Sequence, residues 1–321
     1  MATSMNRRGF MAAAGAGAAM AAQADLQNIE VGGGLRIRRE RFQENLSPWP
    51  LCINTSTIRP ASLDDKIRIT AETGWDAIEP WLSDLEAYEK EGGNLKDLGN
   101  KIKDLGMYVP NVIGLWNCMP EGEKAFEASL EKTRNGMRIA SAIGSKLIAT
   151  VPTPDRADFD PRWAVQCYRR LLNIGLNDYG INPAFEFLGF LKGIHTLGVA
   201  AGVAIDTDHP QACIINDTYH MFRGGSGFNG LSKLSGKLMA QFHINDVPGD
   251  VPREEMGDEH RLFPGDGVLP LAKVFQDLKK IGYQGAISLE TFNRKHWEMD
   301  PKVVAQEGID KVRASIADAG V

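Results

Sequence analysis

The segment KKIGYQGAISLET, residues 279–291, contains the unit that decides the fold. A polar helical stretch ends at a glycine, and a short apolar run follows almost at once. Glycine just past a helix end supplies the left-handed residue that stops the helix, and an uninterrupted apolar run predicts a strand buried on both faces. The same order recurs in residues 71–81, 103–114, 141–152 and 177–189.

Amphipathic helical patterns lie between these strands. They cover residues 61–73, 95–105, 123–143, 160–179, 268–281 and 300–318. Further strands are predicted at 50–56, 202–207 and 238–245, which brings the number of strands to eight. Eight alternating strand–helix units predict an α/β protein with the fold of a (β/α)8 TIM barrel. An open doubly wound sheet is the weaker alternative, because no strand is followed by a glycine-rich phosphate loop.

The N-terminal region is predicted to lie outside the barrel. In residues 1–24, Arg7 and Arg8 precede a weakly apolar run and a small-x-small sequence, the order of a twin-arginine export signal. An Ala-rich helix of the mature protein is the alternative. The apolar run is too short for a permanent membrane anchor, so we expect an exported, periplasmic protein. Residues 25–49 form an extension, and residues 50–321 form a single barrel domain.

Composition excludes some classes of protein. The chain has 321 residues and a net charge of -5, and it has no basic block long enough to bind nucleic acid. Its four cysteines show no C-x-x-C spacing, which argues against a zinc knuckle or a dense disulfide framework. We expect mostly buried thiols.

Polar residues stand at the carboxyl ends of four consecutive predicted strands, where the chemistry of such a barrel is located. The alternation of side chains turns the bulky apolar neighbours toward the helices and these residues inward. They are Glu186, Asp206, His243 and Glu290. This mostly oxygen ligand set predicts one divalent metal ion, Mn²⁺ first, with Co²⁺, Mg²⁺ or Zn²⁺ as alternatives. A structural salt-bridge cluster is disfavoured, because no basic partner stands at these strand ends.

From the first strand onward the chain resembles the xylose isomerase-like TIM barrel family, which includes inosose isomerase and tagatose/psicose 3-epimerase. The resemblance is carried by residues 242–247 (FHINDV), 258–271 (DEHRLFPGDGVLPL) and 278–292 (LKKIGYQGAISLETF). It implies that the four inward residues are the metal ligands.

The resemblance also assigns residues around the metal. It places a substrate-side histidine at His209, in a D-x-x-H motif that begins at Asp206, and a substrate-binding arginine at Arg261. Asp208 has the same strand parity as Asp206, and only the D-x-x-H spacing ranks Asp206 first. Glu79 and Trp116, at other strand ends, are weaker candidates for substrate contacts.

The function that the resemblance implies is a metal-dependent isomerase or epimerase of a keto-sugar or keto-cyclitol. Glu186 and Glu290 would then act as catalytic acid and base during proton transfer through an enediolate. A periplasmic lyase or dehydratase that eliminates from 3-keto-glycosides is the main alternative. A sugar-binding protein has little use for four metal ligands, and the acidic charge argues against the endonuclease of the family. The expected partner is a small carbohydrate or cyclitol, and a homo-oligomer is compatible with the sequence.

Overall fold

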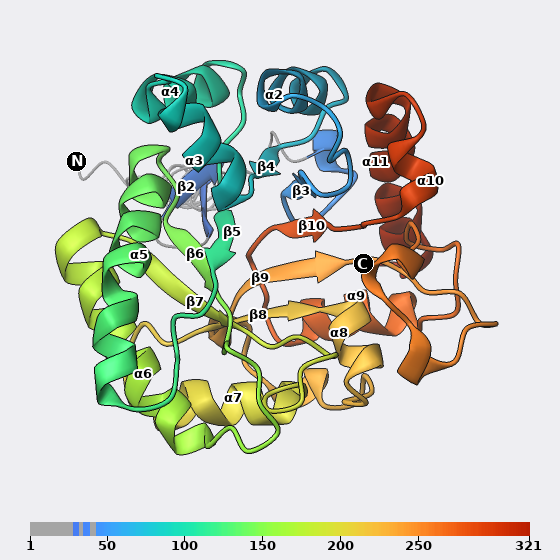
Figure 1. Cartoon of the computed structure of the whole chain (residues 1–321). Coiled ribbons are helices and arrows are strands. Elements are labelled where there is room, and N and C mark those ends of the chain that lie inside the picture. Colours follow the sequence, from blue (N-terminus) through green and yellow to red (C-terminus); the bar gives the residue numbers. More distant parts are fainter. Residues whose placement is uncertain (1–27, 32–34, 39–42) are drawn as a thin grey trace, which may run out of the picture.

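The computed structural model describes residues 28–31, 35–38 and 43–321 and shows a barrel of parallel strands surrounded by helices (Figure 1). The predicted export signal lies outside the described residues. The barrel strands are β3 (Leu51–Asn54), β4 (Ala77–Glu79), β5 (Asn111–Leu115), β6 (Leu147–Thr150), β7 (Asn182–Glu186), β8 (Ile214–Asp217), β9 (Met239–Ile244) and β10 (Ile287–Leu289).

The strands form one sheet in the order β4-β3-β10-β9-β8-β7-β6-β5. The two ends of this sheet meet through isolated parallel bridges, Ala77 to Tyr108 and Trp81 to Ile113, which bring β4 beside β5. The predicted (β/α)8 barrel is therefore confirmed. Among the described residues, no helix combines the length and the apolar character needed to span a bilayer.

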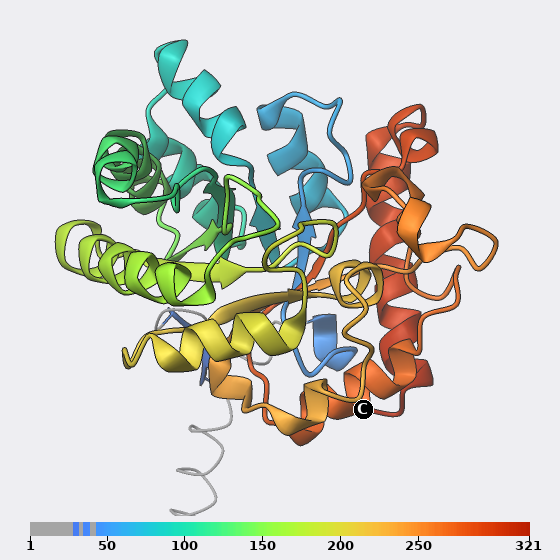
Figure 2. The same cartoon turned by 60° about the horizontal axis from the view of Figure 1, so that its bottom comes forward.

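Helices follow the strands around the outside of the barrel, as the two views in Figures 1 and 2 show. They are α2 (Leu63–Glu72), α3 (Leu82–Lys90), α4 (Leu95–Asp104), α5 (Glu123–Ala142), α6 (Pro161–Ile174), α7 (Leu197–Asp206), α8 (Thr218–Arg223), α9 (Leu271–Lys280), α10 (Arg294–Trp297) and α11 (Pro301–Asp318). Helices α6 and α11 both begin with an Asp-Pro pair, and Asp160 and Asp300 accept hydrogen bonds from the backbone N–H groups of the first turns.

Side-chain alternation divides the core in two. Bulky residues such as Phe185, Phe242 and Leu289 pack between the sheet and the helices, whereas the barrel interior holds smaller side chains such as Ala149 and Ala184. The small interior residues leave room near the axis for the polar side chains described below. The four cysteines are buried free thiols, as predicted.

The N-terminal extension joins the barrel at the amino ends of the strands. A two-stranded antiparallel ladder, β1 (Asn28–Val31) with β2 (Leu35–Arg38), precedes the barrel. Gln43 then donates hydrogen bonds to the carbonyl of Gly74 and to the Asp76 carboxylate. Trp49 is buried and donates its indole N–H to the carbonyl of Tyr283, which fixes the chain just before β3.

One strand prediction is wrong. Residues 202–207 do not form a strand but end helix α7, and the sixth strand of the barrel is β8, farther along the chain. Residues 197–204 are rich in alanine, the best helix former, whereas Ile214 and Ile215 are β-branched and favour a strand. Thr196 begins the helix by accepting a hydrogen bond from the N–H of Val199.

Candidate active site

His243 is the centre of a polar cluster at the carboxyl end of the barrel. Its Nδ1 atom lies 3.2 Å from Glu186 Oε1, 3.3 Å from Glu290 Oε2 and 3.7 Å from Asp217 Oδ2. The cluster forms because Glu186 and Asp217 are the last residues of β7 and β8, while Glu290 directly follows β10. All four residues are at most 4% exposed. Asp217, His243 and Glu290 present atoms close enough to share one metal ion.

Asp217 takes the place that the sequence analysis gave to Asp206. The chain contains a second D-x-x-H motif, Asp217 to His220, and this one follows a strand. Asp217 caps helix α8, because its Oδ1 accepts a hydrogen bond of 2.9 Å from the backbone N–H of His220. The cap explains the spacing of the motif, since it holds the histidine in the first turn beside the aspartate. The β-branched run before Asp217 was the signal that could have selected it.

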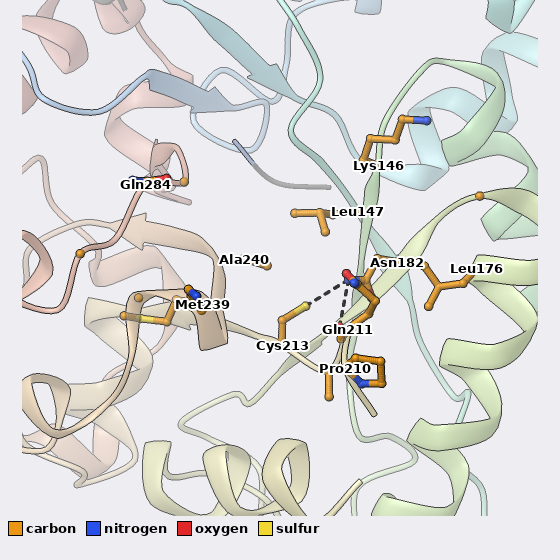
Figure 3. A pocket seen from close by; sticks show the side chains of 16 residues that line it. Lys146, Leu147, Leu176, Asn182, Pro210, Gln211, Cys213, Met239, Ala240 and Gln284 are labelled. Atoms are coloured by element: carbon orange, nitrogen blue, oxygen red, sulfur yellow. Dashed lines mark hydrogen bonds between the residues drawn. The ribbon is translucent and has the colours of Figure 1, made fainter. Parts of the chain in front are cut away.

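Asp206 and His209 lie at the opposite end of the barrel. Asp206 ends α7, and His209 Nδ1 accepts a hydrogen bond from the N–H of Gln211. The next residue, Pro210, lines a cavity of about 620 Å³ whose other walls include the first residues of β6, β7 and β9 (Figure 3). This cavity is therefore at the amino ends of the strands. Asp206 and His209 are therefore far from the polar cluster, and the positions expected for them there are occupied by Asp217 and His220.

Arg261 lies in the cluster, as expected from the sequence. Its Nη1 donates to Asp217 Oδ2 at 3.0 Å and to Glu290 Oε2 at 2.8 Å. Its guanidinium group stacks on the rings of Tyr219 and Phe292 and is 1% exposed. This arginine is the basic partner that was missing from the strand ends in the sequence, because a loop between β9 and α9 supplies it.

The loop that carries Arg261 is held by Asp246. The Asp246 carboxylate accepts backbone hydrogen bonds from Gly265, Gly267 and Leu269. A Cβ atom at Gly267 would lie 2.2 Å from the carbonyl oxygen of Val247, so only glycine fits this turn. Asp258, which the sequence analysis did not single out, binds the guanidinium from the opposite side at 2.6 Å.

The other two predicted substrate contacts occupy different positions. Glu79 is fully buried at the end of β4, and its Oε1 lies 3.1 Å from Nε2 of His243, on the side of the ring away from the carboxylate cluster. Four donors surround its carboxylate, which leaves no acceptor position for a substrate hydroxyl. Trp116 directly follows β5 at the same end of the barrel as the cluster and is 37% exposed.

The buried charges shift the pKa values of the cluster. Burial raises the pKa of Glu186 to about 7, and the neighbouring carboxylates add to this although His243 opposes it. Burial alone would raise the pKa of Glu290, but His243 and Arg261 lower it below its usual value. Burial would likewise lower the pKa of His243, yet the carboxylates of Glu79 and Glu290 hold it well above 6.5. Burial lowers the pKa of His220 to about 3, so this histidine is neutral.

The cluster fits a divalent cation. His243 Nδ1 is buried and forms no well-aligned hydrogen bond with the described residues, although three carboxylate oxygens surround it. The carboxylates require a positive charge at this nitrogen, which a proton supplies in the metal-free protein, as the raised pKa of His243 indicates, and which a bound cation would supply in its place. One His nitrogen with carboxylate oxygens is a donor set that suits Mn²⁺, Co²⁺ or Zn²⁺. Glu186, Asp217, His243 and Glu290 are the residues that would hold the ion.

These pKa shifts predict a pH dependence for the chelator-treated protein. Glu186 protonates near pH 7 in the folded state and near 4.5 when unfolded, so between these values the folded protein binds more protons and becomes less stable as pH rises. His243 acts in the same direction, because its stabilisation is lost as pH rises through its raised pKa.

His220 has the opposite effect, because its pKa falls from 6.5 to about 3 on folding and its contribution to stability rises with pH up to about 6.5. We therefore expect the Tm of the metal-free protein to fall between about pH 6.5 and about pH 8, where only Glu186 and His243 still lose protons. Saturating divalent metal should reduce this fall, because a cation replaces the protons that the cluster loses. Differential scanning calorimetry at constant ionic strength measures both effects. A metal-free Tm that stays level or rises over this interval would contradict the assigned shifts.

Comparisons with known proteins place this chain in a family. The sequence model of the xylose isomerase-like TIM barrel matches residues 67–315. Inosose isomerase of Bacillus velezensis is 26% identical over 271 residues, which covers 81% of this chain and 92% of that protein. D-psicose 3-epimerase of Agrobacterium fabrum is 31% identical over 119 residues, which covers 36% of this chain and 37% of the epimerase.

Two further similarities extend the comparison. The 3-dehydroshikimate dehydratase of Pseudomonas putida is 21% identical over 235 residues, 72% of this chain and 36% of the dehydratase. The crystal structure of the IolI protein with a bound zinc atom superposes with a TM-score of 0.77 at 22% identity, and the match covers 84% of this chain and 99% of IolI. This structural similarity supports the fold. The family match extends from α2 to α11, so the chain belongs to the xylose isomerase-like TIM barrel family and is an enzyme of its sugar isomerase/epimerase group.

Proposed function

We propose that this protein is a divalent-metal-dependent isomerase or epimerase of a keto-sugar or keto-cyclitol. The observation that carries the proposal is the ring of Glu186, Asp217 and Glu290 around the unpartnered Nδ1 of His243. The relatives named inosose isomerase and D-psicose 3-epimerase support the substrate class. The zinc atom bound to the IolI protein supports a divalent metal.

The bound ion would supply a positive charge that polarises a substrate carbonyl and favours loss of the neighbouring C–H proton. The protein supplies the groups that move this proton. Glu290, which accepts a hydrogen bond from Arg261, is anionic and suited to remove it, and Glu186, on the other side of His243, would deliver a proton of its own. A proton placed on the former carbonyl carbon, with a hydroxyl proton passed from one oxygen of the enediol to the other, gives isomerisation. A proton placed on the opposite face of the original carbon gives epimerisation.

Arg261 would orient the substrate oxygens, and His220 would support it. Arg261 is a permanent cation whose position is fixed by Asp217, Asp258 and Glu290. Both ring nitrogens of the neutral His220 face donors: Nδ1 lies 3.1 Å from the N–H of Gly189, and Nε2 lies 3.1 Å from Nη2 of Arg261. His220 would therefore act through Arg261, whose guanidinium it helps to hold beside the cluster.

A dehydratase is the second candidate, and the similarity to 3-dehydroshikimate dehydratase favours it. Elimination shares the first step, removal of a proton next to a carbonyl. The reactions diverge when a leaving group on the next carbon departs with the electron pair. If residues 1–24 direct export, as we propose from their twin-arginine pattern, 3-keto-glycosides would be the substrates to assay for this reaction.

Chelation and a substrate screen test the proposal. We expect purified protein to lose its activity after dialysis against EDTA and to regain it with Mn²⁺, Co²⁺, Mg²⁺ or Zn²⁺. The screen covers inososes, keto-hexoses, 3-dehydroshikimate and 3-keto-glycosides, and NMR in D₂O detects proton exchange at the carbon next to the carbonyl. Exchange with isomerised product supports the first candidate, and exchange with an unsaturated product supports the second. Full activity in EDTA with no bound metal would contradict both.

A further inference from the structure

Glu79 lies behind His243, below the cluster and away from its carboxylates. Both residues have no exposed surface, and Glu79 Oε1 is 3.1 Å from Nε2 of His243. The other ring nitrogen, Nδ1, is the one that faces the cluster. The ring therefore connects a buried carboxylate on one side to the candidate metal position on the other.

The contacts of Glu79 require its carboxylate to be an acceptor only. Oε1 accepts from Asn111 Nδ2 at 2.8 Å as well as from His243, and Oε2 accepts from Asn54 Nδ2 at 2.9 Å and from Ser288 Oγ at 2.7 Å. A carboxylate has about four acceptor positions, and these four donors occupy them. A proton on either oxygen would face one of the donors, so the arrangement fits the anion.

An anionic, acceptor-only Glu79 fixes the tautomer of His243. Nε2 must carry a hydrogen in order to donate to Oε1, and this leaves the lone pair of a neutral ring on Nδ1. The same network reaches a second candidate ligand, because Asn54 Nδ2 donates both to Glu79 Oε2 and to Glu290 Oε1, each at 2.9 Å. Asn54 is itself held by Trp81, whose indole N–H donates to its Oδ1.

We infer that Glu79 is a positioning residue for the metal: it holds His243 with Nδ1 toward the ion and, through Asn54, orients Glu290. It contacts neither substrate nor ion. Carboxylate partners of ligating histidines orient the ring and increase its basicity, and their loss commonly weakens metal binding by about 10- to 100-fold. This inference rests on the proposed metal site, but it makes a separate claim about how that site obtains its affinity.

The test compares E79Q with S288A by isothermal titration of Zn²⁺ and Mn²⁺ into chelator-treated protein. In E79Q the shape of the side chain is kept and its charge is lost, so we expect the metal Kd to rise about 10- to 100-fold. S288A removes one donor to the same carboxylate but not the contact with His243, so it reports the effect of a buried hydrogen bond lost nearby. We expect its metal Kd to match the wild type even if its Tm falls.

Activity at saturating metal gives a second readout. Because Glu79 acts through His243, E79Q should recover most of the wild-type kcat at high metal concentration, whereas loss of a group that touches substrate would not be rescued. An E79Q Kd equal to that of the wild type, or an S288A Kd raised as much as that of E79Q, overturns the inference. If wild-type protein binds no metal, the proposed function fails instead.

A measurement on the wild type keeps the inference testable if E79Q does not fold. Histidine ring nitrogens labelled with ¹⁵N are observed by NMR while Zn²⁺ is added. We expect the Nδ1 resonance of His243 to move and Nε2 to keep its proton throughout. If the resonance of Nε2 shows the large shift of a metal-bound nitrogen, or if Nε2 loses its proton, Glu79 does not set the tautomer.

Discussion

Substituting Asp217 by asparagine is expected to remove most of the metal affinity and activity, whereas D206N should change neither. Asparagine is also a good helix N-cap, so α8 keeps its start and the fold should survive. The substitution removes one negative charge from the cluster and turns an amide toward Arg261, whose Nη1 is 3.0 Å from Oδ2. We expect the metal Kd to rise on the order of 100-fold or more, since loss of a ligand should exceed the effect of losing a residue behind it.

D206N is the matched control for this experiment. It makes the same chemical change in the other D-x-x-H motif, at the end of α7 and at the opposite end of the barrel. The bound metal of D217N, D206N and the wild type is measured by atomic emission, and their metal Kd values are measured by titration of the chelator-treated proteins. Equal metal binding by D217N and the wild type, or a loss confined to D206N, would reject the assignment of the ligand to β8.

The second large effect is expected for E290Q. Each carboxylate oxygen of Glu290 accepts a hydrogen bond, one from Asn54 and the other from Arg261. Glutamine keeps the size of the side chain, but only its single carbonyl oxygen can accept a hydrogen bond. If Glu290 removes the substrate proton, kcat should fall about 10²- to 10⁴-fold, the usual contribution of a general base. Initial rates at saturating metal and loss of deuterium exchange next to the carbonyl separate this effect from weaker metal binding.

Glu298 provides the control for E290Q. It is an exposed glutamate eight positions farther along the chain, just after α10, so E298Q removes the same charge without touching the cluster. We expect E298Q to keep the wild-type kcat and exchange rate. If E290Q binds metal and still turns over substrate at the wild-type rate, Glu290 is not the catalytic base.

The repeated helix–glycine–strand unit made the barrel predictable, because each of its signals is local. Glycine at a helix end and an apolar run each act through the backbone of a few residues. The failure at residues 202–207 arose where these signals conflicted. The run Val203 to Ile205 contains only apolar residues, and such a short run is compatible with a buried strand and also with the end of a helix. Its alanine content and the capping residue Thr196 resolve the conflict in favour of the helix.

The candidate site was only partly predictable, for a related reason. Glu186, His243 and Glu290 were found because they end correctly identified strands, and strand parity then fixes the direction of each side chain. Asp217 was missed because its strand was placed eleven residues too early, at Asp206. Both motifs have the spacing D-x-x-H, so spacing could not distinguish them. The position of Glu79 behind His243 depends on two strands that are not neighbours in the sheet.

Local signals in the chain were enough to predict the barrel, most of its strand ends and three of the four residues of the polar cluster. They were enough because helix caps, apolar runs and side-chain parity depend on neighbouring residues. Three-dimensional packing selected the aspartate that joins the cluster and placed Glu79 behind His243. It also brought in Arg261 as the cation of the site, from a loop after β9. These choices depend on which strand ends meet across the barrel axis, and residues such as Asn54 and Glu290 that touch there are far apart in the chain.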